Sequence, residues 1–455
     1  MLSQRTKIMK ERVFERKVYN KMLAWKKERR GKTALLLNGA RRVGKSTIVK
    51  AFAKREYKSY LLIDFTKASD EVKELFRHLD DLDFLFLRLQ AIFHTELQER
   101  KSVIIFDEVQ SCPQARQAIK YLVEDGRYDY IETGSLISIR KNTENILIPS
   151  EETRITMFPM DYEEFLWAMG DKQTMPLIRH AFENSRSLGD NLHRRLMRQF
   201  RLYMLVGGMP QAVNTYLDTN NLAETDAVKR EILTLYMDDL RKIDGTGRAS
   251  RIFESVPGEL AKSKLHYQVG SVIKNAVPSK MDHIWQELED SITVNFCYKC
   301  TDPNVGMALH KDYENFRIFL GDTGLFVTLA FWDKDVTDNQ LYQKLLSDKL
   351  SADLGYLYEN IVAQCLRAAG HTLFYYTFQA DSENKNHYEI DFMLSVSNKI
   401  IPIEVKSSGY KTHKSLDMFE KKYSARIKNR ILLYTKDFRK EGGVLYLPIY
   451  MTSLL

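Results

Sequence analysis

Cysteine is scarce in this chain of 455 residues, and long hydrophobic runs are absent. The 4 cysteines are too few and too scattered for a disulfide framework, so we expect reduced thiols. Cys297 and Cys300 form a lone C-x-x-C pair without a second pair or close histidines, which favours a strand position over a zinc site. No apolar run approaches the span of a bilayer, and no hydrophobic segment follows the basic N-terminus. We therefore expect neither a membrane helix nor a signal peptide, and we predict a cytoplasmic protein without membrane contact.

Low-complexity segments and internal repeats are also absent, and the composition is that of a folded protein. Hydrophobic residues make up 44% and charged residues 28%, and the length predicts roughly two to four domains. The charge is unevenly distributed. Residues 1–60 carry 19 Lys and Arg against 4 Asp and Glu, a net +15, whereas the whole chain is only +8, so the remainder is acidic at about −7.

This basic segment has two interpretations. It can attract a nucleic-acid backbone or an acidic partner protein. Alternatively, its Lys and Arg side chains simply face water, on a helix whose apolar stripe consists of Ile8, Val18, Met22 and Trp25. A charge run alone specifies no ligand, so both interpretations stay open.

A phosphate-binding loop is the most informative motif of the chain. Residues 39–46 fit G-x-x-x-x-G-K-[ST] without a gap, and the apolar run 34–37 leads into them. Backbone N–H groups and the N-terminus of the following helix would hold phosphates, Lys45 would add a charge at the terminal phosphates, and Ser46 would hold Mg²⁺. The predicted nucleotide-binding residues are Gly39, Ala40, Arg41, Arg42, Val43, Gly44, Lys45, Ser46 and Thr47.

An acidic pair ends a second buried strand. Four apolar residues, 103–106, precede Asp107 and Glu108. We expect Asp107 to bind Mg²⁺ and Glu108 to be the base that aligns the attacking water. A third strand ends near Thr133 and Ser135, and either hydroxyl is a candidate sensor of the γ-phosphate, although such residues are also ordinary turn formers.

The pattern of elements divides the chain into successive parts. Short apolar runs alternate with helical stretches at first, which predicts a parallel sheet buried on both faces. Helices follow, interrupted at the glycines and proline of 206–210. Beyond residue 246, three helices and a hairpin are the elements of a winged helix, in which residues 271–288 are a candidate DNA-recognition helix with few basic residues. The last part combines a helix and strands.

A second set of acidic residues lies in this last part. Period-two alternation places Glu389 and Asp391 on one face of a strand. It also places Glu404 and Lys406 on one face of the next strand. Two carboxylates beside a lysine suit magnesium-assisted phosphodiester cleavage, with Asp391 and Glu404 holding the metal and Lys406 steadying the attacking water or the developing charge. Glu359, on the preceding helix, would complete the metal shell. An ordinary amphipathic hairpin produces the same loose spacing.

From Ala34 to the end, the chain resembles bacterial and archaeal AAA+ ATPases that carry a C-terminal domain with the PD-(D/E)XK nuclease fold. In that family a P-loop domain is followed by a helical lid, a winged helix and the nuclease-like domain. The matching segments occur in order along nearly the whole chain. They are Gly39–Thr47, Phe106–Gln110, Thr133–Ser135, Phe158–Phe165, Val206–Pro210, Leu320–Leu325, Tyr388–Phe392 and Ile401–Ser408.

The resemblance implies an α/β protein of four domains. These are a P-loop AAA+ core at 1–160, a helical lid at 161–245, a winged helix at 246–335 and a nuclease-like domain at 345–455. It also assigns catalytic roles in ATP hydrolysis to Lys45 and Glu108. The nuclease-type core falls on Asp391, Glu404 and Lys406.

One departure from the family pattern concerns Arg154. Family members commonly carry a Gly-Arg pair at this point, whereas here the pair is Thr153-Arg154. Arg154 is therefore a candidate nucleotide sensor, a candidate arginine finger to a neighbouring subunit, or an ordinary surface arginine.

Two main classes of function follow from the motifs, beside a third interpretation in which the winged helix makes the protein a transcriptional regulator. The first is an ATPase, with ATP and Mg²⁺ as cofactors, that couples its nucleotide cycle to a DNA-associated winged helix and a nuclease-like domain. The second is a nucleotide-controlled switch or interaction module without nuclease activity, which would bind a protein partner. DNA, an unidentified protein and further copies of this chain are the candidate partners.

Overall fold

The computed structural model describes residues 12–135, 150–262, 264–333, 355–379 and 387–455. It divides into two compact units, unit 1 (Met1–Phe158) and unit 2 (Pro159–Leu455). Among the described residues, no helix is long and apolar enough to cross a membrane.

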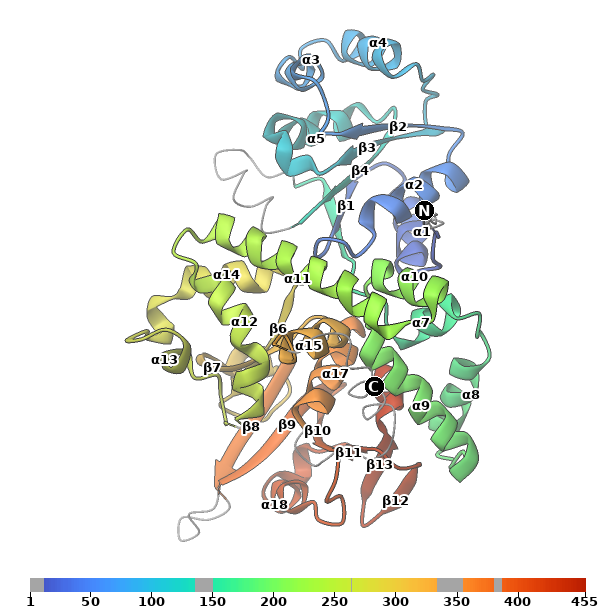
Figure 1. The fold of residues 1–455 in the computed structure, drawn as a ribbon. Coiled ribbons are helices and arrows are strands. Elements are labelled where there is room, and N and C mark those ends of the chain that lie inside the picture. The colour runs from blue at the N-terminus through green and yellow to red at the C-terminus, as the bar shows by residue number, and fades with distance from the viewer. Residues whose placement is uncertain (1–11, 136–149, 263, 334–354, 380–386) are drawn as a thin grey trace, which may run out of the picture. The chain divides into compact units, whose positions relative to one another are not determined.

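Unit 1 alternates helices and strands along the chain (Figure 1). Its elements are α1 (Val18–Arg29), β1 (Ala34–Asn38), α2 (Lys45–Glu56), β2 (Ser59–Asp64), α3 (Asp70–Glu74), α4 (Leu82–Phe93), β3 (Ser102–Asp107), α5 (Pro113–Asp125), β4 (Asp129–Gly134) and β5 (Glu152–Thr156). The strands form one sheet in the order β2-β3-β4-β1-β5, and each neighbouring pair is parallel. The predicted parallel sheet is confirmed, and β5 at its edge is a strand that the sequence did not indicate.

Both faces of this sheet are covered, because β1 and β3 are buried at every position. Ala34 and Leu36 point into a core shared with α3, α4 and α5. Leu35 and Leu37 alternate with them, so they face the opposite side of the sheet, where they are fully buried. The carboxyl ends of β1, β3 and β4 therefore lie at one edge of a rigid, buried sheet.

Helix α1 resolves part of the question about the basic segment. Val18, Met22 and Trp25 are its buried residues, so the predicted apolar stripe is confirmed for these three. Ile8 lies outside the described residues. The basic side chains of α1 lie between and opposite the buried positions, as an amphipathic helix requires.

Unit 2 begins with helices and continues as a mixed α/β fold (Figure 1). Its helices are α7 (Tyr162–Ala168), α8 (Thr174–Glu183), α9 (Asp190–Val206), α10 (Pro210–Thr219), α11 (Leu222–Ile243), α12 (Arg248–Ala261), α13 (Val269–Val272), α14 (Asp282–Ser291), α15 (Thr323–Ala330), α17 (Gly355–Ala368) and α18 (Lys414–Tyr423). Its strands are β6 (Val294–Cys300), β7 (Lys311–Leu320), β8 (Leu373–Gln379), β9 (His387–Val396), β10 (Lys399–Lys406), β11 (Arg430–Tyr434), β12 (Arg439–Glu441) and β13 (Val444–Pro448).

These strands form a single sheet in the order β12-β13-β11-β10-β9-β8-β6-β7. The hairpin β6–β7 falls in the segment predicted as a winged helix, yet β6 pairs in parallel with β8 from the segment predicted as nuclease-like. Strands from both sides of the proposed boundary at 335–345 thus share one sheet, and the four-domain division stays a prediction. Cys297 and Cys300 lie on β6 as buried, free thiols, which confirms their predicted strand position.

The candidate recognition segment 271–288 does not form one helix, and this expectation was wrong. Helix α13 ends at Val272 and α14 begins only at Asp282. Asn275 lies between them with a left-handed φ of 60°, a conformation that does not continue a right-handed helix.

A glycine turn fixes the centre of unit 2. The turn between α9 and α10 approaches α15 so closely that a Cβ on Gly207 would lie 2.4 Å from Asp322 Oδ1. A Cβ on Gly208 would lie 2.1 Å from the carbonyl oxygen of Met160. The N–H of Gly208 donates to Asp322 Oδ2 at 2.6 Å. The motifs 206–210 and 320–325, which the sequence leaves without a chemical role, therefore pack against each other.

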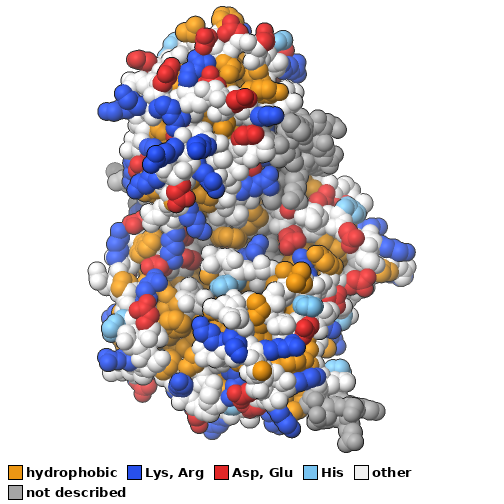
Figure 2. Space-filling model, turned by 180° about the vertical axis from the view of Figure 1, so that it is seen from behind, with side chains coloured by type: hydrophobic (Ala, Val, Ile, Leu, Met, Phe, Trp, Pro, Cys, Tyr) orange, Lys and Arg blue, Asp and Glu red, His pale blue; other side chains and the backbone are white. Residues whose placement is uncertain are grey.

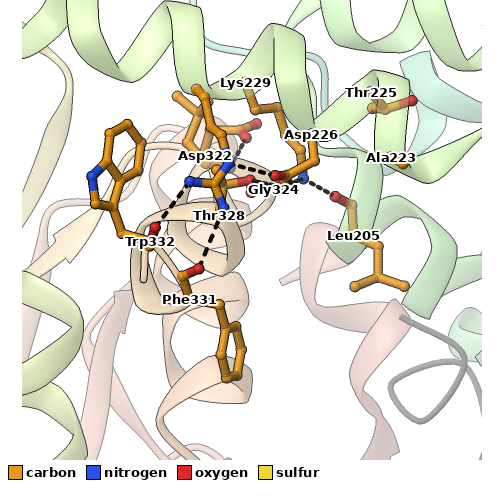
Figure 3. Close-up of polar contacts among 12 residues, drawn as sticks. Leu205, Ala223, Thr225, Asp226, Lys229, Asp322, Gly324, Thr328, Phe331 and Trp332 are labelled. Carbon is orange, nitrogen blue, oxygen red and sulfur yellow. Dashed lines mark hydrogen bonds and ion pairs between the residues drawn. The ribbon is translucent and has the colours of Figure 1, made fainter. Parts of the chain in front are cut away.

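Helices α11 and α15 are joined by a second polar contact, which Figure 3 shows in close-up. Lys229 Nζ donates to the carbonyl oxygens of Leu205 at 2.7 Å and Gly324 at 3.2 Å. Thr328 Oγ1 donates to Asp226 Oδ1 at 2.5 Å. Burial lowers the pKa of Lys229, and the nearby Asp226 carboxylate opposes that shift. Charged groups are tolerated in this interior because each has polar partners.

We expect the Gly208→Ala substitution to destabilise the protein by about 2 kcal/mol or more, because the added methyl group meets backbone that has no room to move. Chemical denaturation followed by circular dichroism measures this change. Gly258→Ala is the matched control, since nothing lies within 4 Å of its added Cβ and it sits inside α12. The control should be neutral or stabilising by roughly 0.5–1 kcal/mol. Equal stability of the two variants would contradict this account of the turn.

Candidate nucleotide site and acidic cluster

The predicted phosphate-binding loop lies between β1 and α2, at the carboxyl edge of the unit 1 sheet. Gly44 adopts a φ of 97° directly before α2, and Arg42 a φ of 67°. Gly39 is required for a different reason, because a Cβ there would lie 2.4 Å from the carbonyl oxygen of Met157. The strand, the loop and the helix occur as predicted, with the N-terminus of α2 at the end of the loop.

Lys45 is buried at the first position of α2. Its Nζ donates to the carbonyl oxygens of Gly39 and Ala40, each at 2.9 Å. Burial lowers the pKa of Lys45 to about 8, while the carboxylates of Glu108 and Asp107 favour its charged form. The lysine is thus held against the loop, beside the backbone that would surround a phosphate.

Asp107 is the centre of a hydroxyl–carboxylate network beneath the loop. Ser46 Oγ donates to Asp107 Oδ1 at 2.7 Å, and Thr133 Oγ1 donates to the same oxygen. Hydroxyl and carboxylate oxygens are ligands that Mg²⁺ accepts together with substrate phosphates. The residues present therefore fit a magnesium–nucleotide complex, in which Ser46 and Asp107 would be the protein ligands.

Glu108 has a left-handed φ of 55°, which is uncommon for a residue with a side chain. Its N–H donates to Thr133 Oγ1 at 3.3 Å, and its carboxylate accepts a hydrogen bond from Gln110 Nε2. Such backbone strain is often found at functional sites, where the surrounding structure maintains it. Here it turns the chain just after Asp107, so that the two neighbouring carboxylates have different partners.

The remaining predicted nucleotide-binding residues differ in their exposure to solvent. Val43 is buried and Thr47 half-buried, whereas Arg41 and Arg42 are exposed. Arg154 lies on β5 opposite Leu36, and its guanidinium contacts Glu152 at 2.5 Å with 46% of the side chain exposed. A role for Arg154 in sensing or as a finger stays a prediction.

Arg16 is a contact of the loop that the sequence did not reveal. It is buried, and its guanidinium donates to the carbonyl oxygens of Val43 at 3.0 Å and of Phe158 at 2.6 Å. A single side chain thus joins the phosphate-binding loop to the last residue of unit 1. In the sequence, Arg16 is one of 19 basic residues within 1–60, and nothing in the spacing distinguishes it.

In unit 2, the structure brings the predicted acidic residues of β9 and β10 together. The two strands are antiparallel neighbours, with Phe392 opposite Ile403. Asp391 Oδ2 accepts a hydrogen bond from the N–H of Val405 at 2.8 Å. Lys406 Nζ lies 3.0 Å from Glu404 Oε1. Asp391, Glu404 and Lys406 therefore lie at neighbouring positions on two paired strands.

Arg317, on β7, is the unexpected member of this cluster. Its guanidinium forms an ion pair with Glu389 and lies 3.6 Å from Glu359 and 4.0 Å from Asp391. No short-range pattern connects β7 with β9, because β6 and β8 separate them in the sheet. We refer to Arg317, Glu359, Glu389, Asp391 and Glu404 as the acidic cluster.

Burial governs the charges of the cluster. It raises the pKa of Glu359 to about 7, with the Asp391 carboxylate acting in the same direction and Arg317 opposing. It also raises the pKa of Glu404 to about 7, with Lys406 opposing. Across the described ranges, no group of three or more His, Cys, Asp or Glu side chains is arranged to hold a metal ion. Of the predicted Mg²⁺ ligands, Asp391 therefore interacts with both Glu359 and Glu404, but the three are not arranged as a metal site, and a guanidinium lies beside Glu359 and Asp391.

Comparison with known protein families finds a domain match that covers the candidate nucleotide site. Residues 31–166 match the model of an AAA domain. This part of the chain is thus similar to an AAA domain. This finding supports an AAA+ ATPase, and the domain includes every predicted nucleotide-binding residue. Residues 197–336 match a domain of unknown function (DUF8612), and residues 354–451 match another (DUF4143).

Solved structures give weaker similarities. PCH-2 from C. elegans is 12% identical with a TM-score of 0.27, over 46% of this chain and 65% of its own. The Aeropyrum pernix Orc1 protein, solved in complex with DNA, is 13% identical with a TM-score of 0.28, over 73% of this chain and 96% of its own. Cdc6p from Pyrobaculum aerophilum is 14% identical with a TM-score of 0.24, over 76% and 97%. The chain thus spans less than two thirds of PCH-2, and no curated protein matches it.

We expect Arg16→Ala to destabilise unit 1 by about 1–3 kcal/mol, because one buried and one partly buried carbonyl oxygen lose a charged donor. Nucleotide affinity should also fall several-fold, since the backbone at Val43 is no longer held. Thermal unfolding and calorimetric titration with ATP measure the two effects. Lys21→Ala, which removes an exposed charge from α1, is the control and should change neither quantity. Unchanged affinity in Arg16→Ala would show that the contact does not support the loop.

Proposed function

We propose that this protein is an ATPase that binds ATP with Mg²⁺ in the loop at 39–47 and hydrolyses it. The observation that carries the proposal is the network beneath the loop, in which Ser46 and Thr133 both donate to Asp107 and Lys45 is held beside them. A hydroxyl, a carboxylate and a buried lysine at the carboxyl edge of a parallel sheet are the groups that a magnesium–triphosphate complex requires.

Each residue has a separate task in this proposal. The backbone N–H groups of the loop and the N-terminus of α2 bind phosphate oxygens, and Lys45 places its positive charge at the terminal phosphates. Ser46 and Asp107 would hold Mg²⁺, which neutralises charge on those phosphates when bound. Glu108 aligns the attacking water, and Thr133 links Glu108 to Asp107 through its hydroxyl. A change at the terminal phosphate therefore reaches the backbone of Glu108 through one side chain.

Two variants distinguish binding from hydrolysis. Lys45→Ala should weaken ATP binding at least tenfold, because the positive charge at the terminal phosphates is lost. Glu108→Gln should keep ATP binding but lower turnover by 10²-fold or more, as expected when a catalytic base is removed. Calorimetry and a phosphate-release assay measure the two quantities. Lys50→Ala, an exposed position of the same helix, is the control. A Lys45→Ala variant that binds like the wild type would disprove the proposal.

The finer proposal couples this cycle to a DNA-associated winged helix at 246–335 and a nuclease-like domain at 345–455. Helices α12, α13 and α14 followed by the hairpin β6–β7 support the first part, and Asp391, Glu404 and Lys406 on adjacent strands support the second. Basic side chains of unit 1, visible in Figure 2, supply charge for a DNA backbone. The exposed ones on α1 and α2 and beside them are Lys21, Lys27, Arg29, Arg30, Lys50, Lys54, Arg55 and Lys58.

DNA association can be tested by charge reversal. Lys54→Glu/Arg55→Glu should weaken binding of a DNA duplex about tenfold at low salt and flatten the salt dependence, because two phosphate contacts are lost. Arg194→Glu/Arg195→Glu, an exposed pair on α9 outside both segments, changes the net charge equally and is the control. Equal loss in both pairs, measured by fluorescence anisotropy, would assign the effect to net charge alone.

Cleavage is tested separately, by comparing the wild type with Asp391→Ala in magnesium. Equal activity of these two would remove the nuclease half of the proposal.

A second candidate is a nucleotide-controlled interaction module without nuclease activity, whose C-terminal part binds a protein partner. The presence of Arg317 among the carboxylates favours it. ATP is then held rather than turned over rapidly, so Glu108→Gln should barely change an already slow wild-type rate. A fast wild type that the substitution abolishes would reject this candidate.

A further inference from the structure

The acidic cluster includes a positively charged side chain, Arg317. The metal site predicted from the sequence did not include this arginine. The side chain of Arg317 is 8% exposed, which leaves its guanidinium largely away from water. It is paired with Glu389 and has Glu359 and Asp391 within 4.0 Å. A buried guanidinium among carboxylates is stable only when such partners surround it.

Further contacts hold Arg317 on its other sides. Its Nε donates to the carbonyl oxygen of Leu265 at 3.3 Å. Its guanidinium carbon lies 5.0 Å from the centre of the Tyr375 ring, a cation–π distance. The side chain is thus fixed by a carbonyl, a ring and carboxylates that come from separate elements. This is a built binding site for a guanidinium rather than an accidental surface pair.

Most carboxylate oxygens of Asp391 and Glu404 already have a partner. One oxygen of Asp391 accepts the N–H of Val405, and the other is the oxygen nearest Arg317. Glu404 Oε1 is paired with Lys406. Among the carboxylate oxygens of these two residues, Glu404 Oε2 alone is buried without a hydrogen-bond partner. A divalent ion, which needs several oxygens at once, does not fit beside the guanidinium in this arrangement.

We infer that Arg317 takes the place of a divalent metal ion in the acidic cluster, so that Arg317 and a metal exclude each other there. Both neutralise the same carboxylates, and the site holds one of them at a time. In the fold described here the cluster is a structural ion-pair site. Metal binding requires the guanidinium to be withdrawn. This inference does not depend on the proposed ATPase activity, since it concerns residues of unit 2 alone.

Manganese binding tests the exclusion directly. All variants carry Asp107→Asn, which removes the predicted metal ligand of unit 1, and Mn²⁺ is titrated without nucleotide and followed by electron paramagnetic resonance. The parent should bind no Mn²⁺ that depends on Asp391. Arg317→Gln should bind Mn²⁺ at least tenfold more tightly than the parent, and adding Asp391→Asn should abolish that binding. Mn²⁺ should also raise the melting temperature of Arg317→Gln and not that of the parent.

Two further variants keep the test decisive. If Arg317→Gln does not fold, Arg317→Gln/Glu389→Gln removes one charge of each sign and leaves Glu359, Asp391 and Glu404 for the metal. Arg439→Gln, an exposed arginine on β12, controls for the loss of positive charge. Binding of Mn²⁺ by the parent that Asp391→Asn removes would overturn the inference. Failure of both Arg317 variants to gain Mn²⁺ affinity would overturn it equally.

Discussion

The contact between Asp322 and the glycine turn is the interaction on which unit 2 depends. The carboxylate accepts the N–H groups of Gly208 at 2.6 Å and Leu325 at 2.9 Å. Burial raises the pKa of Asp322, and these backbone donors oppose the shift by favouring the charged form. Because the carboxylate bonds to backbone on two different segments, the turn and the start of α15 are fixed relative to each other. A larger residue in the turn would separate them.

The same contact extends to the large sheet through α17. The N–H of Leu320, at the end of β7, donates to Asn360 at 2.8 Å, and the N–H of Thr323 donates to Gln364 at 2.7 Å. Gln364 in turn donates to the hydroxyl of Tyr203 at 3.0 Å. Helix α17 packs across β6, β7, β8 and β10, so the polar chain that begins at the turn ends on the sheet. The segments 206–210 and 320–325 thus have a structural role, because their glycines and Asp322 allow this close packing.

The sequence predicts the parts of both sites that depend on short-range patterns. The loop at 39–46 and the residues Asp107 and Glu108 follow from spacing, because strand ends and helix starts are local. The pairing of β9 with β10 is also local, since two residues, 397 and 398, separate them. Arg16 and Arg317 could not be predicted, because each contacts residues far away in the sequence and neither has a distinctive neighbour. The shared sheet of β6 and β8 was missed for the same reason, since parallel pairing leaves no mark in either strand.

The two carboxylate sites differ in what satisfies them, and the difference has a functional consequence. Asp107 is bound by neutral hydroxyl groups, which can remain in place when Mg²⁺ arrives, because a hydroxyl oxygen can both donate to the carboxylate and coordinate a metal. The carboxylates around Arg317 are bound by a guanidinium, which offers no lone pair and must leave before a cation enters. A site held by hydroxyl groups is therefore prepared for a metal, whereas a site held by an arginine is closed to it. The candidate nucleotide site is thus arranged to accept a metal ion, whereas the ion pairs of the acidic cluster stabilise the sheet of unit 2.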